Sequence, residues 1–190
     1  MSTWSAARRW LRDLVAGQPV EAPRYAGVAG LAEGIHAIVE VESLAAEAIY
    51  SCRPLSVSRK VNAFGRPIHL GLVGGGRGAL AAACGMAMSG RRTALIVRAR
   101  DLTGAQDLLR SACERRIPLV VHVELEEHAA YHAFADLGCA AMLARDLQHA
   151  MDLTLAARRI AERGLGVVLV AMDVGTAGAV RNVKALDAGL

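Results

Sequence analysis

The chain has 190 residues, of which 54% are hydrophobic but only 4% are aromatic, and its formal net charge is +4. The length suits one domain with a substantial core, which this composition requires to be built from aliphatic side chains. The charge is only mildly basic and no nucleic-acid-binding module is recognisable, so we expect no nucleic-acid partner. No apolar run approaches the ~20 residues of a membrane-spanning helix, and the N-terminus lacks an apolar signal core, so we expect a cytoplasmic protein.

Residues 1–17 are expected to form an amphipathic helix. Arginines lie on one side, and the apolar residues recur on the other at helical spacing: Trp4, Ala7, Leu11, Leu14 and Val15. This apolar stripe fits packing on its own domain or docking on a partner chain, and binding to a membrane surface is the weaker alternative. Residues 18–33 include two prolines and two glycines, and we expect them to be a linker.

From residue 34 onwards, helical and strand-like patterns alternate. Strands are predicted at 47–50, 68–73, 93–97, 118–123, 139–143 and 167–172, and helices at 35–46, 77–89, 103–115, 126–137 and 147–163. The continuously apolar run 118–123 is typical of a strand covered on both faces. The alternation predicts an α/β domain over residues 34–183, with three layers, a parallel sheet and helices on both faces, followed by a tail at 184–190.

A glycine turn joins the strand at 68–73 to a helix of small residues. Gly74, Gly76 and Ala79 fit the dinucleotide pattern G-x-G-x-x-G/A, in which glycines admit a pyrophosphate to the helix N-terminus. The acidic residue that would hold the ribose is missing. Arg98 and Arg100 stand in its place and would suit only the 2′-phosphate of NADP. The alternative is a turn that simply lets the helix pack tightly against the sheet.

Metal-ligating residues are sparse. His128 and His132 lie four residues apart on a predicted helix and could share one face, but nothing in the pattern supplies further ligands in a fixed frame. The four cysteines contain no Cys-x-x-Cys pair, which indicates free thiols in a reducing compartment rather than an iron–sulfur or zinc site. We therefore predict no metal site.

The charges are distributed unevenly along the chain. No Asp or Glu occurs from residue 48 to residue 100, where nine basic residues lie: Arg53, Arg59, Lys60, Arg66, Arg77, Arg91, Arg92, Arg98 and Arg100. Several of them follow predicted strands, at the sheet edge where α/β domains bind ligands. A concentrated positive field would attract phosphates, carboxylates or an acidic protein. The alternative is a set of dispersed arginines that only maintain solubility.

From about Gly34 to Val180 the chain resembles the thiamine-pyrimidine-binding domain of the pyruvate (2-oxoacid):ferredoxin or flavodoxin oxidoreductases. AIYSCRPLS (Ala48–Ser56) is similar to the family's AIYPITPSS, and ERRIPLVVHV (Glu114–Val123) to its L-P-x-V-x-H-V strand. Two further stretches, Asp136–Arg163 and Val167–Gly178, are similar to its T-G-x-A-M-L…Q-E-A helix and to its last strand and turn. The resemblance implies the same alternating α/β fold.

The resemblance also implies where the chemistry has changed. The family's glutamate that hydrogen-bonds the aminopyrimidine of thiamine diphosphate aligns at or near Gly76, and the threonine near the substrate carboxylate aligns with Arg53. The T-x-S-x-G loop aligns with residues 97–101. The family's iron–sulfur motifs and diphosphate-binding domain are also absent from this chain. We therefore expect a non-catalytic or accessory subunit, working with a partner that carries the diphosphate-binding domain or as a homo-oligomer.

Two alternatives are kept. One is a thiamine diphosphate-dependent half-site completed by a partner subunit, with the acid supplied by Glu47 or by the partner. The other is an NADP- or anion-binding module built on the Gly74–Ala79 turn. In both, the candidate residues for a cofactor or an anion are Gly74, Gly75, Gly76, Arg77, Arg98 and Arg100, and Arg53 is the candidate for a substrate carboxylate.

Overall fold

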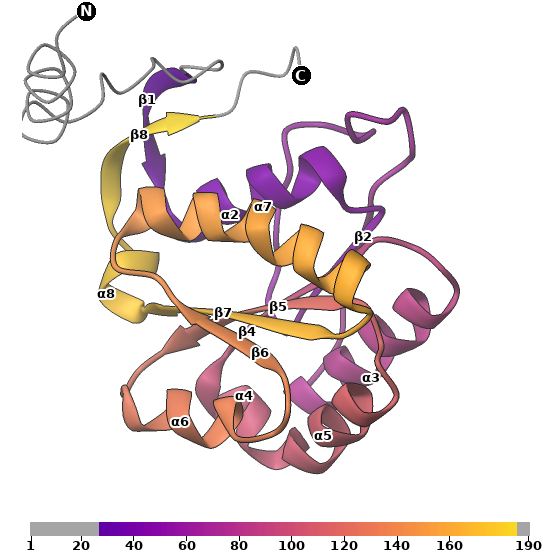
Figure 1. The fold of residues 1–190 in the computed structure, drawn as a ribbon. Helices are drawn as coiled ribbons and strands as arrows, with labels where there is room; N and C mark the ends of the chain where they lie inside the picture. The colour runs from indigo at the N-terminus through magenta and orange to yellow at the C-terminus, as the bar shows by residue number, and fades with distance from the viewer. Residues whose placement is uncertain (1–26, 186–190) are drawn as a thin grey trace, which may run out of the picture.

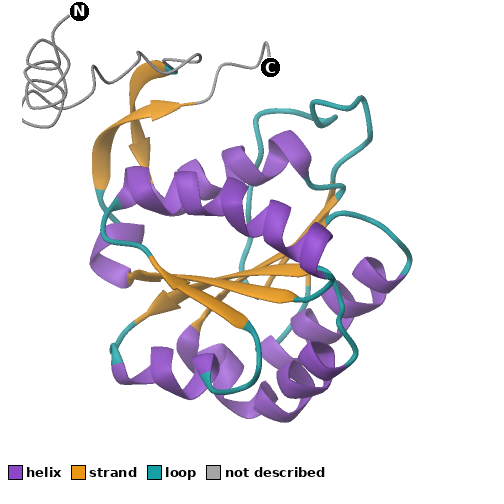
Figure 2. Ribbon diagram, in the orientation of Figure 1, coloured by secondary structure: helices purple, strands orange, loops and turns teal. Residues whose placement is uncertain are grey.

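A sheet of six parallel strands forms the middle layer of the domain (Figures 1 and 2). The computed structural model describes residues 27–185, so the helix expected at 1–17 lies outside the described residues. The strands are β2 (Ala48–Ser51), β3 (His69–Leu72), β4 (Thr93–Arg98), β5 (Leu119–Leu125), β6 (Ala140–Leu143) and β7 (Val167–Asp173). Their spatial order is β3-β2-β4-β5-β7-β6, and each neighbouring pair is parallel.

Helices cover both faces of this sheet. One face carries α2 (Gly34–Ala45) and α7 (Leu147–Gly164), and the other carries α3 (Gly76–Met88), α4 (Ala99–Leu102), α5 (Gln106–Glu114) and α6 (Ala129–Ala135) (Figure 1). A 3₁₀ turn, Thr103–Ala105, joins α4 to α5, and the short helix α8 (Val174–Ala177) follows β7. The predicted three-layer α/β fold with a parallel sheet is confirmed.

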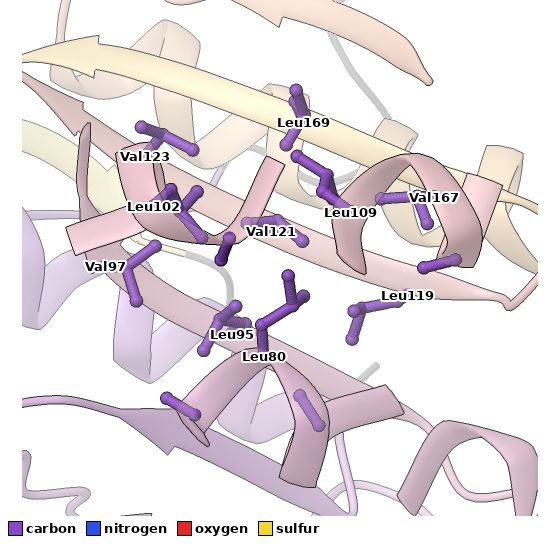
Figure 3. Packing of buried hydrophobic residues seen from close by; sticks show 14 of the residues in the cluster. Leu80, Leu95, Val97, Leu102, Leu109, Leu119, Val121, Val123, Val167 and Leu169 are labelled. Carbon is purple, nitrogen blue, oxygen red and sulfur yellow. The ribbon is translucent and has the colours of Figure 1, made fainter. Parts of the chain in front are cut away.

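Alternate residues of the central strands face opposite layers, as the strand period of two requires. On β5, Leu119, Val121 and Val123 belong to the cluster that includes Leu80 of α3 and Leu109 of α5 (Figure 3). The intervening residue Val120 packs instead with alanines of α7. Burial on both faces accounts for the continuously apolar sequence of this strand.

Helix α3 lies close to the sheet because its inner side is built from small residues. Ala79, Ala83 and Ala87 are buried there, with Leu80 as the largest side chain of the inner face. Short side chains bring the helix backbone near β2 and β4, and this close approach shapes the turn at the start of the helix.

The structure adds an antiparallel ribbon that the sequence patterns did not predict. Strand β1 (Val28–Glu33) occupies the end of the expected linker, and β8 (Val180–Ala185) runs past the last predicted strand into the expected tail. The domain expected at residues 34–183 therefore leaves out β1 and the last two residues of β8, although these two strands pair with each other. Val183 of β8 is buried against α2 and α7, which anchors the ribbon to the domain.

Candidate functional site

The candidate site lies at the carboxyl edge of the sheet, between β2 and β4. From β2 the chain moves to β3 on one side, whereas β4 lies on the other side, so the connections diverge at this point. Ligands of open parallel sheets bind at such a switch point. A cavity of about 240 Å³ lies here, lined at the end of β2 and just after it by Ser51, Cys52 and Arg53, and at the end of β4 and just after it by Arg98, Arg100 and Asp101. The structure thus brings together three of the predicted arginines.

A buried carboxylate, Glu124 on β5, lies beneath two of these arginines. Its side chain is only 5% exposed, and it forms ion pairs with Arg53 and, at 3.8 Å from Oε2 to Nε, with Arg98. The register places Arg98 directly beside Glu124 on the adjacent strand. Sequence reasoning did not assign Glu124 to this site. Its place near the carboxyl end of a predicted central strand, level with Arg98, was the available signal.

Arg100 is also paired with a carboxylate, and Asp101 is hydrogen-bonded to the backbone. Arg100 Nε lies 3.6 Å from Oε1 of Glu126, and Asp101 Oδ2 accepts a hydrogen bond of 3.4 Å from the backbone N–H of Arg98. Three arginines therefore face three carboxylates: Glu124, Glu126 and Asp101. The positive field expected from residues 48–100 is balanced here by acidic residues later in the chain.

Burial and neighbouring charges shift the pKa of two groups at the cavity. Burial, and then the nearby charge of Arg98, lower the pKa of Arg53, while Asp101 opposes the shift. Burial and the negative charge of Asp101 both raise the pKa of the Cys52 thiol. Cys52 is therefore predominantly a neutral thiol at pH 7, which disfavours a role as a nucleophile.

The glycine turn lies one strand away from this cavity, after the edge strand β3. Gly75 has φ 78°, a conformation that glycine adopts without strain, and the space beside Gly74 and Gly75 is open. Gly76 is different, because a Cβ added there would overlap the backbone carbonyl of Asp101 and lie 3.1 Å from its Cβ. The first position of α3 is therefore closed to any side chain.

Arg77 is held by a neighbouring helix. Its guanidinium donates two hydrogen bonds to Asp107 at the start of α5, at 2.6 and 2.8 Å, and a longer one to the carbonyl of Gly104. The Arg77 hydrogen bond lowers the pKa of Asp107 to about 2. An anion at the glycine turn would have to compete with Asp107 for this cation.

Glu47, which was considered as a substitute acid, lies at the opposite edge of the sheet. It precedes β2, and its carboxylate accepts a hydrogen bond of 3.2 Å from the backbone N–H of Arg92, just before β4. The length of the strands separates it from the turn that follows β3. That part of the half-site alternative is wrong, because parallel strands place their first and last residues at opposite edges.

A second group of charged residues is sealed between the sheet and the helices α2 and α7. Glu42 of α2 contacts His122 Nε2 of β5 at 2.7 Å and accepts a hydrogen bond of 2.5 Å from Arg158 of α7. Arg158 also donates to the carbonyl of Thr93 at 2.9 Å. Burial alone would raise the pKa of Glu42, but Arg158 and His122 outweigh it and hold the pKa below its ordinary value. This group is enclosed and connects four elements, α2, α7, β4 and β5.

Two further findings concern metals and membranes. Within residues 27–185, no three His, Cys, Asp or Glu side chains gather closely enough to hold a metal ion. His128 lies 3.8 Å from Asp173, and the His132 ring packs edge-on against Tyr131. None of the helices in that range combines the length and apolar character needed to cross a membrane.

Comparison with known proteins identifies the fold. No family model and no curated protein matches the sequence. Among solved structures, the chain is similar to a 2-oxoglutarate:ferredoxin oxidoreductase from Magnetococcus marinus, solved with 2-oxoglutarate, coenzyme A and succinyl-CoA bound. The TM-score is 0.70 at 15% sequence identity, over 84% of this chain and 32% of that one. The chain thus shares its α/β fold with part of this neighbour and spans about a third of it.

Proposed function

We propose that the chain is an accessory, pyrimidine-domain-like subunit of a 2-oxoacid:ferredoxin oxidoreductase-type assembly, and that it does not itself activate thiamine diphosphate. The shared fold and the resemblance of four sequence stretches to that family support the assignment to this type of assembly. The chain spans about a third of the neighbour's length and would account for only that part of such an enzyme.

The observation that carries the proposal is the crowded start of helix α3. The position that aligns with the family's activating glutamate is Gly76, where the backbone of Asp101 fills the space that a side chain needs. No carboxylate occurs between residues 48 and 100 to replace it. The nearest acids, Asp101 and Glu124, are already engaged by Arg98 and Arg53. These residues therefore do not fit an activated thiamine cofactor.

The sheet edge beside the turn favours a protein partner. Strand β3 is hydrogen-bonded only to β2 among the described strands, and Leu72 on it is largely exposed. Met88 at the end of α3 is also exposed. Open strand edges and exposed apolar side chains are features of surfaces that pair with other chains. The partner that best fits the proposed role carries a diphosphate-binding domain.

A second candidate is a site for a small carboxylate in the cavity between β2 and β4. The convergence of Arg53, Arg98 and Arg100 favours it. A carboxylate ligand would have to take the place of Glu124 or Glu126 on these arginines, so we expect weak binding unless a partner chain rearranges the ion pairs. NADP is less favoured, because the glycine turn follows an edge strand rather than the switch point.

The test is to purify the tagged full-length chain from its native host and to identify the proteins that accompany it. We expect a chain with a diphosphate-binding domain, and recovery of the chain without any such protein would contradict the subunit role. The purified assembly is then assayed for 2-oxoacid-dependent reduction of a viologen dye. Asp101→Asn and Glu124→Gln should leave this rate unchanged, because neither carboxylate serves as the activating acid.

A half-site in which Asp101 or Glu124, rather than Glu47 or the partner, replaced the missing acid would give the opposite result for the same variants. If Asp101 or Glu124 activates the cofactor, its replacement should lower the rate by about 100-fold or more, as expected for loss of an acid–base group. Circular dichroism of each variant serves as the control for folding, which matters most for the buried Glu124. Arg53→Ala tests the carboxylate site, since an increase in the KM for the 2-oxoacid would favour that second candidate.

A further inference from the structure

An apolar groove of about 640 Å³ runs along helix α2 and shares no lining residue with the cavity at the switch point. We call it the α2 groove. One wall is a face of α2 that begins at its N-cap. Its residues recur at spacings of three and four: Glu33, His36, Ala37, Glu40, Val41 and Leu44. At 1.5 Å per residue this wall is about 17 Å long, enough for three turns of a second helix.

The β1–β8 ribbon forms the opposite wall. Val183 is buried at its base, with Ala37 and Val41 of α2, whereas Leu31 at the rim is 78% exposed. Apolar residues thus line both the base and the rim of the groove. A groove with one helical wall and an apolar base suits an amphipathic helix.

The polar groups of the groove define the charge of its occupant. Glu33 and Glu40 lie on the helical wall two turns apart, and Glu40 already accepts hydrogen bonds from the backbone N–H and the hydroxyl of Ser58 at 2.7 and 2.5 Å, so Glu33 is the more open of the two carboxylates. Arg59 on the remaining side has a buried Nε–H with no acceptor among the described residues. A matching occupant would present arginines or lysines to the glutamates and a carbonyl oxygen to Arg59. The unpaired carbonyls at a helix C-terminus are acceptors of this type.

We propose that residues 1–17 of the same chain occupy the α2 groove. The expected helix there has an apolar stripe, and Arg8, Arg9 and Arg12 outnumber its single acid, Asp13. The described residues also begin next to the groove. Gly27 packs against the backbone of Ala185, which lines the groove. The nine residues 18–26 can span up to about 30 Å, and so short a tether holds the segment at millimolar effective concentration.

Trp4 and Trp10, both in this segment, are the two tryptophans of the sequence, so intrinsic fluorescence reports on it alone. In the full-length protein we expect emission at shorter wavelength, and weaker quenching by acrylamide, than in a synthetic peptide of residues 1–17. Leu31→Glu at the groove rim should shift the emission to that of the peptide. Leu155→Glu, on the exposed side of α7 and outside the groove, is the matched control and should leave it unchanged.

Three results would overturn the proposal. The first is wild-type emission equal to that of the free peptide. The second is emission unaffected by Leu31→Glu and also by Glu33→Arg, a second variant that reverses a charge on an exposed side chain and so preserves folding. The third is a blue shift that disappears on dilution together with a fall in mass, since the segment would then lie on a second copy. A concentration-independent shift that both variants remove supports the proposal.

Discussion

Glu42 is the most tightly held carboxylate in the described part of the chain, since Arg158 and His122 contact it from two other elements. Its lowered pKa means that the unfolded chain binds more protons than the folded one at pH values just below the ordinary glutamate pKa. The contribution of Glu42 to stability is therefore fully present above that pKa and is lost as the pH falls through the lower, folded-state value.

Glu42→Gln tests this account of the buried group. At pH 7 the variant should lose about 3–5 kcal/mol of unfolding free energy, because Arg158 is left buried without its counter-charge. Urea titrations from pH 7 down to pH 3 should also show a smaller loss of stability on acidification than in the wild type. Glu162→Gln, which removes an exposed partner of Arg92, is the control and should change little. Equal losses in the two variants would contradict the account.

At the scale of elements, the β1–β8 ribbon is attached to the domain through few residues. Val183 is 5% exposed and packs on α2 and α7, whereas Val180 on the same strand is 62% exposed. The two valines share a strand but differ in burial, which makes them a matched pair for testing whether burial of Val183 anchors the ribbon.

Val183→Ala should raise the rate of amide exchange in residues 28–33 and 180–185 about tenfold, because two buried methyl groups are worth about 1.5 kcal/mol. Exchange in β5 and β7 should not change, since the ribbon opens without the sheet. Val180→Ala should leave all of these rates near those of the wild type. If both variants alter exchange equally, the ribbon is not anchored through Val183.

For the molecule as a whole, charged residues are unevenly distributed along the sequence, but the fold brings basic and acidic residues together in pairs. The segment 48–100 carries nine basic residues and no acid, yet acids from later elements meet several of them. Arg53 and Arg98 meet Glu124, Arg77 meets Asp107, and Arg92 meets Glu162. This arrangement favours a structural role for these arginines over a strong anion-attracting surface.

The sheet and its helices could be predicted from the sequence, because each strand or helix shows its own hydrophobic periodicity and ends at a recognisable boundary residue. The strand at 118–123 and the helix at 147–163 agree with β5 and α7 within a few residues. The β1–β8 ribbon could not be predicted in this way. Its strands lie about 150 residues apart in the chain and are mostly exposed, so neither shows a regular alternation.

The candidate site was only partly predictable for a similar reason. Arg53, Arg98 and Arg100 were recognised from their places after strands, and the structure does bring them together. Their pairing with Glu124 depends on which strands are neighbours, and a single sequence does not reveal that order. The closed space at Gly76 likewise results from the path of the backbone at Asp101, a contact across 25 positions of the chain.

The measurement that tests the central claim most directly compares the unfolding free energies of Gly76→Ala and Gly74→Ala. The claim is that the backbone of Asp101 closes the start of α3 to a side chain, at the position that aligns with the activating glutamate of the family the sequence resembles. We predict a loss of about 1–3 kcal/mol for Gly76→Ala, as overpacking typically costs, and a change within about 0.5 kcal/mol for Gly74→Ala. Without a clash, alanine at a helical position should stabilise the chain. An unchanged or more stable Gly76→Ala protein would therefore contradict the claim.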